Sequence, residues 1–591
     1  MPKLAKTKVK VAVAPKVTPT EDSAAKVVAP QAKIALAQVR VEDFRGLRDL
    51  CVTLDPLTVL IGENNAGKTS FLQALGIIFG PSRASHDDFY VAADGTRSAR
   101  FVIDVRLIPS TGNEFDEGMR ARFKGAIQFP DASSASEYVV IRATGEVDAA
   151  GGGVSLERRF VKGWGSTRGD AAALELLTDH VGLQHLELIA FFVLDAKRDL
   201  VEELRVRNSH WGRLLSELEI SSTAKADIEK QLDELSLEII AASPILADVK
   251  AELRTVRDAL TSSVSDVAIS PLPGRVEELA RGVDVLLKPP SGTPLPMRLH
   301  GQGARSLAAV MVFKSFIQRR VGASQTFRPL VIAAFEEPEA HLHPQAHRAM
   351  FHLIAALDAQ RIVSTHSPYV VRVVEDVHAI RVIRRTSSAA ISCNSVPRIT
   401  KGAAIFSAEE LAQLRKFVLR NNGEALFARL VVVFEGDTED QAFPVFARHH
   451  WNKDHAALGI SFARTEGAGS GKHVIRALTY FGIPWVLFAD GDPEGKKGVK
   501  ALETALERKL TAQELVQLPK NASLEQYLID EGYREPIEKA IADCHGTTAL
   551  ADYRDVNDGQ KLNKNAVRDY QAKGWEERLI LDYCRSCKGT F

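Results

Sequence analysis

Residues 57–80 read LTVLIGENNAGKTSFLQALGIIFG. The apolar run LTVLIG predicts a buried β-strand, and SFLQALGIIFG has the residue spacing of a helix. Between them, GENNAGKT (62–69) fits the pattern G-x-x-x-x-G-K-[ST], in which glycines let backbone N–H groups point at phosphate oxygens. The order strand, glycine loop, helix is the context that this pattern requires, so the stretch predicts an α/β nucleotide-binding fold.

The residues of the glycine loop have separate expected roles. Lys68 is expected to supply positive charge to the terminal phosphates, and Thr69 is expected to offer its hydroxyl to Mg²⁺. The helix that follows adds the positive end of its dipole. A chance glycine turn is the alternative interpretation. The expected nucleotide-binding residues of the loop are Asn65, Gly67, Lys68, Thr69 and Ser70.

A second apolar strand ends in acidic residues, as the other half of an ATPase site requires. In LVIAAFEEPE (330–339), the apolar run leads into Glu336 and Glu337. Glu336 is expected to hold the hydration shell of Mg²⁺, and Glu337 is expected to orient the attacking water as a general base. The pairing of this strand with the glycine loop favours an ATPase over a chance arrangement.

This ordered set of motifs resembles the ATP-binding-cassette (ABC) ATPases, in the branch that contains the SMC and RecF proteins. FRGL (44–47), with Arg45, resembles the early strand turn of that branch. GQGARS (301–306) resembles its signature loop, and His366 resembles its switch histidine. The resemblance implies that two copies of the domain sandwich ATP. Gly303 and Ser306 of one copy would then face the glycine loop of the other.

The chain departs from that pattern in three places. Glu336 stands where the family has Asp, GQGARS replaces the usual Leu-Ser-Gly-Gly-Gln, and His343 stands where an Asp is expected. Glu binds Mg²⁺ through water almost as well as Asp. The other two differences leave the hydrolysis rate and the dimer geometry open, and the Q-loop glutamine is not located.

Two strands near the C-terminus also end in acidic residues. VVVFEGDTE places Glu435 at a strand end and Glu439 four residues later, and WVLFADGD places Asp490 and Asp492 at i and i+2. Acids at the carboxyl ends of parallel strands gather at one edge of a sheet. Clustered carboxylates repel unless cations separate them, so two Mg²⁺ or Mn²⁺ ions are expected, with Ca²⁺ a further candidate. The alternative is solvated acids in βα loops.

These acidic motifs resemble the Toprim domain of topoisomerases, primases and some nucleases. An ABC-type ATPase joined to a C-terminal Toprim domain resembles the OLD (overcoming lysogenization defect) nucleases, here over nearly all of residues 34–591. The form is that of their second class, which includes Gabija-type nucleases. The resemblance implies that Ser523 and Glu525 complete the second metal site. It also implies a basic residue that stabilises transition-state charge, for which Lys564 is the first choice and Lys561 the second.

Length and composition set the limits of the chain. At 591 residues it is too long for one hydrophobic core, and its formal net charge is zero. Five cysteines do not make a disulfide framework, and no apolar run reaches the roughly 18 residues that span a bilayer. The first 30 residues lack the apolar core of a secretory signal. We therefore expect a cytoplasmic protein without a membrane partner.

The pattern along the chain predicts five segments. The apolar residues of ADIEKQLDELSLEII follow one stripe of a helix, which predicts a helical insertion that serves as the dimer contact. The expected segments are a disordered basic tail (1–33), the first ATPase part (34–167), the insertion (168–265), the second ATPase part (266–420) and the Toprim domain (421–591).

Together the motifs predict an ATP-binding, metal-dependent DNA endonuclease that forms a homodimer. EGAGSGK (466–472) could follow a phosphate backbone through its glycines and Lys472, with a plain turn as an equal alternative. The family resemblance implies phage defence or DNA repair, beside a helicase partner encoded elsewhere. One alternative is a Toprim enzyme that breaks and rejoins strands, which needs a nucleophilic tyrosine in a DNA-breaking domain. The other is a nucleotide-gated DNA-binding protein that does not cleave.

Overall fold

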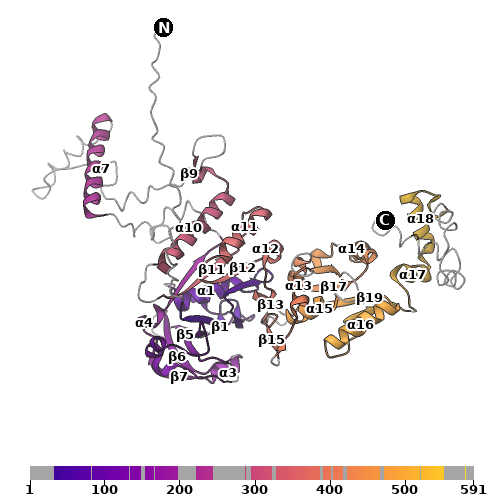
Figure 1. Ribbon diagram of the computed structural model, residues 1–591, viewed down its shortest axis with the longest axis horizontal. Coiled ribbons are helices and arrows are strands. Elements are labelled where there is room, and N and C mark those ends of the chain that lie inside the picture. Colours follow the sequence, from indigo (N-terminus) through magenta and orange to yellow (C-terminus); the bar gives the residue numbers. More distant parts are fainter. Residues whose placement is uncertain are drawn as a thin grey trace, which may run out of the picture.

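The computed structural model of the chain describes residues 32–80, 83–131, 134–147, 153–165, 167–196, 221–243, 286–287, 295–322, 328–385, 390–400, 403–416, 422–465, 471–519, 521–551, 580 and 583. Figure 1 shows an N-terminal body and a C-terminal body, each built of strands and helices, that meet near α12 and α13. Within the described residues, the N-terminal body has two six-stranded sheets and the C-terminal body has one sheet of four strands.

The first sheet of the N-terminal body is antiparallel throughout. Its buried face carries apolar side chains that pack with α1 (Lys68–Phe79) and with the second sheet in one cluster. In spatial order its strands are β2 (Leu47–Thr53), β1 (Ile34–Phe44), β4 (Arg100–Pro109), β5 (Val139–Val147), β6 (Val154–Lys162) and β7 (Glu175–His180).

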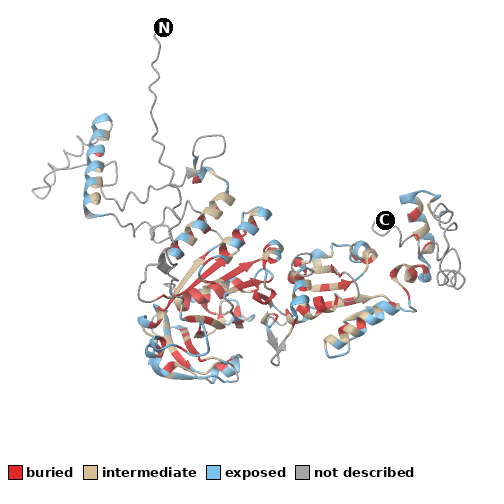
Figure 2. Ribbon diagram, in the orientation of Figure 1, coloured by how far each residue is buried: buried red, intermediate tan, exposed pale blue. Residues whose placement is uncertain are grey.

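The second sheet is parallel except for its edge strand β14. The central strands are apolar almost throughout because α1 covers one face and α10 and α11 cover the other (Figure 2). In spatial order its strands are β14 (Ile391–Asn394), β13 (Ile380–Arg385), β3 (Leu57–Ile61), β12 (Gln360–Thr365), β11 (Leu330–Glu336) and β8 (Ile189–Leu194).

Helices of the N-terminal body lie on and beside these sheets. The longer ones are α7 (Ser222–Ala242), α10 (Gln302–Gly322) and α11 (Pro344–Ala355). Helix α12 (Pro368–Val373) is short. The shorter elements are α2 (Glu117–Phe123), α3 (Arg168–Ala172), α4 (Leu183–Leu186), β9 (Leu286–Leu287), β10 (Leu295–Pro296), β15 (Ile399–Thr400), β16 (Ala403–Ala404) and α13 (Ala408–Leu414).

The C-terminal body is a parallel sheet between helices. Phe443 of α14 (Asp437–Trp451) packs against rings of the sheet on one face, and α15 (Gly471–Tyr480) packs with α16 (Pro493–Ala505) on the other. Beyond the sheet lie α17 (Leu524–Leu528) and α18 (Arg534–His545). The strand order is β18 (Ile460–Arg464), β17 (Leu430–Phe434), β19 (Trp485–Ala489) and β20 (Leu515–Gln517).

This architecture confirms the expected fold class: an α/β domain with the strand-loop-helix of a nucleotide site, followed by a small parallel α/β domain. In the second sheet of the N-terminal body and in the sheet of the C-terminal body, strands end at loops that carry the acidic motifs. In the parts of the chain that the structure describes, no helix is long and apolar enough to cross a membrane.

The expected helical insertion does not begin at residue 168. Residues 175–180 and 189–194 are β7 and β8, which close the two sheets of the N-terminal body. The run IAFFVL of β8 is apolar because the strand pairs with the buried β11. Helix α7 lies in the expected segment, but much of 168–265 lies outside the described residues, as does nearly all of the tail 1–33. The insertion as a dimer contact therefore stays a prediction.

A continuous cluster of buried side chains joins the two bodies. It runs from Val59 and Val371 of the N-terminal body through Leu426 to Val431 and Ile475 of the C-terminal body, and all five are fully buried. Leu426 belongs to a short 3₁₀ helix, η7 (Gly423–Phe427), which packs against α12. The two bodies therefore share a hydrophobic core.

We expect Leu426→Ala to destabilise both bodies at once. Truncating a fully buried leucine costs about 2–5 kcal/mol because it leaves a cavity. Hydrogen exchange should show faster exchange in both β3 and β17. Leu183→Ala, at a leucine that is 78% exposed, is the control and should change stability by less than about 0.5 kcal/mol. Loss of protection in β17 alone would contradict a shared core.

Candidate functional site

The loop between β3 and α1 borders a cavity of about 840 Å³. All five loop residues expected at the nucleotide line it, together with Glu337 and His366. The complete lining is Gly46, Asn64, Asn65, Ala66, Gly67, Lys68, Thr69, Ser70, Glu337, Ser364, His366 and Arg385. One cavity thus gathers motifs that lie about 300 residues apart in sequence.

The glycine loop is packed so closely that its glycines are required. Gly67 has φ 103°, in the left-handed region that favours glycine. A Cβ on Gly62 would lie 2.2 Å from the carbonyl oxygen of Ile383 in β13. The neighbouring strand therefore fixes the path of the loop.

Lys68 lies at the floor of this cavity. Its Nζ donates to the carbonyl oxygens of Gly62 (2.8 Å) and Glu63 (2.9 Å). Burial lowers the pKa of Lys68 to about 8, against the opposing effect of Glu337. A bound anion would offset the cost of burying this charge, which is what a phosphate group would provide.

Of the two acids at the end of β11, Glu337 lines this cavity, and Glu336 does not line it but contacts Thr69. Thr69 donates a hydrogen bond from its hydroxyl to Glu336, so the two expected Mg²⁺ ligands are in contact. Glu337 has φ 41°, a conformation that costs of order 1–3 kcal/mol and is typical of functional sites. Its carboxylate lies 3.3 Å from Nε2 of His366, whose pKa is lowered by burial and by Lys68. Glu337 and His366 therefore lie in contact with each other in the lining of the cavity.

Two arginines differ from expectation. Arg45 pairs with Asp88 (Nε to Oδ1, 2.7 Å) and is not among the residues that line the cavity. Its ion pair depends on a residue 43 positions away, which the FRGL motif does not reveal. Arg385 does line the cavity, with Nη2 3.3 Å from the carbonyl oxygen of Gly46. Sequence reasoning missed Arg385, because the strand it ends, IRVIRR, is interrupted by arginines and lacks the continuous apolar run that precedes the acidic motifs.

The residues of the expected signature loop begin α10. Ser306 is fully buried within this chain, so its side chain is not presented to a second copy in this conformation. A Cβ on Gly303 would lie 2.8 Å from the carbonyl oxygen of His341, so this glycine packs against the loop after β11. His343, at the position of the expected Asp, instead caps the N-terminus of α11. Their contact with a second copy stays a prediction.

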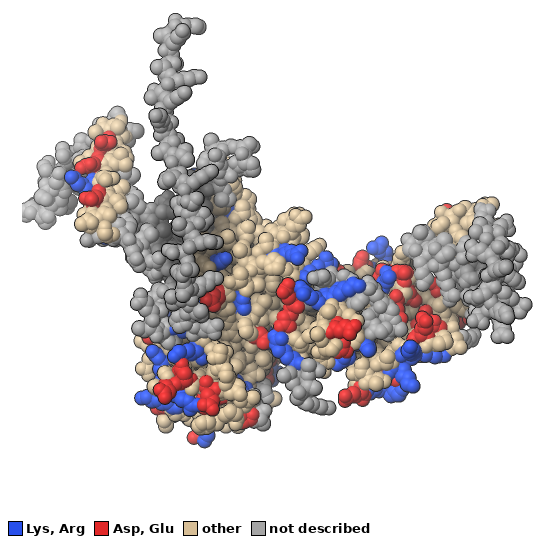
Figure 3. All heavy atoms as spheres, viewed as in Figure 1, with Lys and Arg blue, Asp and Glu red and all other residues tan. Residues whose placement is uncertain are grey.

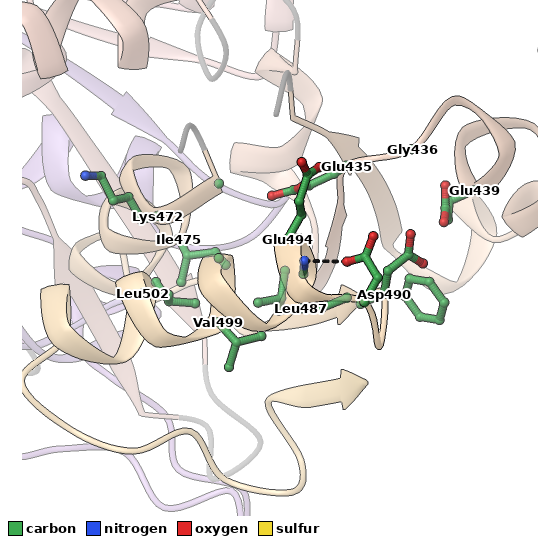
Figure 4. A pocket seen from close by; sticks show the side chains of 16 residues that line it. Glu435, Gly436, Glu439, Lys472, Ile475, Leu487, Asp490, Glu494, Val499 and Leu502 are labelled. Atoms are coloured by element: carbon green, nitrogen blue, oxygen red, sulfur yellow. Dashed lines mark hydrogen bonds between the residues drawn. The ribbon is translucent and has the colours of Figure 1, made fainter. Parts of the chain in front are cut away.

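The acids of the C-terminal body gather where two adjacent strands end. Glu435 follows β17 and Asp490 follows β19, and the parallel register pairs Val433 with Leu487. Both side chains therefore leave the sheet at the same edge (Figure 4). They line a cavity of about 90 Å³ with three further acids and one cation: Glu439, Asp492, Glu494 and Lys472.

The electrostatics of this cavity follow from its crowded carboxylates. Burial raises the pKa of Glu435, and the negative charges of Asp490, Asp492 and Glu494 raise it further. Among the described residues, no group of three or more His, Cys, Asp or Glu side chains is arranged to hold a metal ion as it stands. The donor set is nonetheless all oxygen and its repulsion would be relieved by a cation, which suits Mg²⁺ or Mn²⁺.

Glycines leave room for the acids to lie close to the backbone and to one another. A Cβ on Gly436 would lie 1.7 Å from Oε2 of Glu439, and a Cβ on Gly495 would lie 2.3 Å from the carbonyl oxygen of Asp490. Asp492 caps the N-terminus of α16, because its Oδ1 accepts a hydrogen bond from N–H of Gly495 at 2.7 Å. The E-G-x-x-E and D-x-D motifs thus fix the backbone as well as the charges.

The third acidic motif lies beside the first. Ser523 caps α17 and donates to Oε2 of Glu525 at 2.8 Å, and Oε1 of Glu525 accepts from Thr438 of α14 at 2.7 Å. The pair is therefore tied to the helix that carries Glu439, although neither residue lines the cavity. Lys564 and Lys561 lie outside the described residues.

Glu494 is the acid that sequence reasoning missed. It follows Asp492 by two residues, as Asp492 follows Asp490, so the signal was a continued i, i+2 spacing. In Figure 4 its side chain lies close to that of Glu435. It adds a fifth carboxylate to the cavity, beside the expected Glu435, Glu439, Asp490 and Asp492.

Comparison with known families divides the chain where the structure does. Residues 34–399 match the family described as "Protein of unknown function (DUF2813)", which is more than half of the chain. Residues 426–492 match "Overcoming lysogenization defect protein-like, TOPRIM domain". The second match ends at Asp492 and contains Glu435, Glu439 and Asp490.

Three relatives are similar over most of their length. The uncharacterized protein YbjD of Escherichia coli (strain K12) is 23% identical over 85% of this chain and 87% of its own. The OLD nuclease of Thermus scotoductus (strain ATCC 700910 / SA-01) is 26% identical over 77% and 82%, respectively. The Old nuclease of Escherichia phage P2 is 21% identical over 78% and 77%.

We expect Gly436→Ala to weaken divalent-cation binding by about tenfold or more, because Glu439 must move away from the new methyl group. Titration calorimetry with Mn²⁺ measures this. Gly169→Ala, at a glycine with open space around it, is the control. Unchanged Mn²⁺ affinity in Gly436→Ala would show that Glu439 is not needed at the cation site.

Proposed function

Because the chain belongs to the DUF2813 family and carries an OLD-like Toprim domain, we propose that it is an ATP-binding, divalent-metal-dependent DNA endonuclease. The observation that carries this proposal is the meeting of Glu435, Asp490 and Asp492 at one cavity from two adjacent strand ends. Two relatives that match over most of this chain are named as OLD nucleases. The chemistry of the cavity agrees with that activity.

The carboxylates would hold cations against a phosphodiester. Two divalent ions bound there would supply an activated water and stabilise the leaving oxygen. Glu435, Asp490 and Asp492 would be shared or neighbouring ligands, since their charges already affect one another. Glu439 would join them from α14. Ser523 and Glu525 would support this group through Thr438, which lies next to Glu439.

The N-terminal body would bind ATP in the cavity at the glycine loop. Lys68 would exchange its two carbonyl contacts for phosphate oxygens, which are better partners for a buried ammonium group. Thr69 and Glu336 would hold the Mg²⁺ that accompanies the nucleotide. Glu337, next to His366, would orient the attacking water. The nucleotide would regulate how the C-terminal body engages DNA.

The cellular setting is proposed from the family resemblance. The chain would act as a homodimer in the cytoplasm, with Gly303 and Ser306 turned toward the second copy's ATP after a local rearrangement of α10. Phage defence or DNA repair would be its pathway, with a helicase encoded elsewhere as a candidate partner. Purification from the native host with its bound proteins would test that partner.

We expect the full chain to nick or linearise supercoiled plasmid in Mg²⁺ or Mn²⁺ and to lose that activity in EDTA. Glu435→Gln and Asp490→Asn keep the side-chain shape but remove a charge, and each should reduce cleavage by more than about 100-fold. Gel electrophoresis of the plasmid measures this. Glu507→Gln, at an exposed residue just after α16, is the matched control and should cleave normally.

Other outcomes would remove the proposal. Cleavage that persists in both Glu435→Gln and Asp490→Asn would place the activity elsewhere. Protein bound covalently to the broken DNA would instead indicate a strand-rejoining enzyme. If the chain binds DNA but does not cleave it with any of several divalent ions, the alternative of a nucleotide-gated DNA-binding protein that does not cleave would be favoured.

Lys68→Ala should abolish ATP hydrolysis, because the phosphates lose their buried cation. Release of inorganic phosphate measures the rate, and Glu337→Gln should bind ATP but hydrolyse it at least about 100-fold more slowly. Normal hydrolysis in Lys68→Ala would show that this cavity is not the ATPase site. Basal plasmid cleavage should survive in Lys68→Ala, since Lys68 lies in the other body.

A further inference from the structure

We propose that the exposed lysines of α16, Lys496, Lys497 and Lys500, form a phosphate-binding face that holds the DNA backbone beside the carboxylate cavity. The inference rests on the proposed function, because it takes DNA as the substrate. It assigns the surface that receives that substrate, which none of the sequence motifs identifies.

The carboxylate cavity alone would repel DNA. Five acids line it, and one cation, Lys472, accompanies them. The formal net charge of the whole chain is zero, so long-range attraction cannot offset this repulsion. A nuclease of this composition needs a local positive surface next to its acidic site.

Helix α16 provides such a surface at the required place. The helix begins directly after Asp492, and its Val499 and Leu502 pack inward. Lys496, Lys497 and Lys500 are all exposed, and helical spacing puts them within an arc of about 100° on the outward side. Figure 3 shows blue side chains over this helix, at the lower edge of the C-terminal body.

The pairing of the cations along this helix and just beyond it changes with distance from Asp492. Just beyond its far end, Lys509 pairs with Glu503 at 2.6 Å and Arg508 pairs with Glu514 at 2.6 Å, so each of those cations already has a carboxylate partner. Near the cavity, within the described part of the chain, neither Lys497 nor Lys500 has a carboxylate partner, and Lys496 bonds only the amide of Asn521. The three lysines nearest Asp492 along the helix therefore have no carboxylate partner among the described residues and could contact a phosphate.

The dimensions suit a nucleic-acid strand. From Asp492 to Lys500 the helix rises roughly 12 Å, which is the axial length of about three to four nucleotides. A strand that follows α16 would reach the cavity at the helix N-terminus, where Lys472 lines the cavity from α15. The lysines would bind phosphates without reading bases, so they would add affinity rather than sequence preference.

The salt dependence of DNA binding tests this face. The full chain and Lys497→Ala/Lys500→Ala are titrated with a labelled 30-base-pair duplex in EDTA, at several KCl concentrations, by fluorescence anisotropy. Each lost phosphate contact should lower the slope of log K against log[salt] by about 0.9, so the double variant should lose about 1.8. Its affinity at 100 mM salt should fall by about tenfold or more. Lys509→Ala, at an exposed lysine that lies just beyond α16 and is already paired with Glu503, should match the wild type.

Cleavage kinetics provide a second measurement. The lysines do not touch the reacting atoms, so the double variant should raise KM for plasmid and leave kcat unchanged. A wild-type slope, or an equal loss in Lys509→Ala, would overturn the phosphate-binding face. A chain that binds DNA with the expected slope change but never cleaves would keep the face and remove the nuclease. If the wild type cleaves plasmid but the double variant keeps the wild-type salt slope, the nuclease would remain and the phosphate-binding face would be excluded.

Discussion

Repulsion between carboxylates at the ends of β17 and β19 is the constraint on which the C-terminal body depends. The fold gathers these acids although their proximity makes Glu435 harder to ionise. Two features bring them together: adjacent parallel strands in fixed register, and glycines whose missing side chains leave room for the close approach. Bound positive charge would relieve this repulsion, which is the physical reason for proposing a cation site here with a phosphate backbone beside it.

Contacts of β13 and of the residues before β17 connect the cavity at the glycine loop, here called the nucleotide cavity, with the carboxylate cavity. Neighbouring residues on β13 face opposite ways. Arg385 lines the nucleotide cavity, while Nη1 of Arg384 donates to the carbonyl oxygen of Ala428 at 2.6 Å. In the next residue, Arg429 pairs with Glu63 of the glycine loop at 3.1 Å. Since β17 then leads directly to Glu435, contacts connect the glycine loop to the carboxylate cavity.

Sequence alone predicted those parts whose cause is local. Buried parallel strands are continuous apolar runs, so β3, β11, β17 and β19 and the polar residues at their ends could be read directly. Strand β7 could not, because ELLTDH is mostly exposed and lacks a buried face. Tertiary contacts decided the rest. Arg45 is diverted to Asp88, and the pair Ser523 and Glu525 is positioned by Thr438. No local pattern contains these distant partners.

The core shared by the two bodies limits how such a protein can evolve. Leu426 and Val431 lie in one buried cluster with Val59 and Val371, so the boundary between the family matches runs through a packed interior. The C-terminal body produced alone would expose to solvent the apolar side chains that the N-terminal body covers in the intact chain. Recombination at this boundary is therefore expected to destabilise both products, so we expect the two bodies to be inherited together.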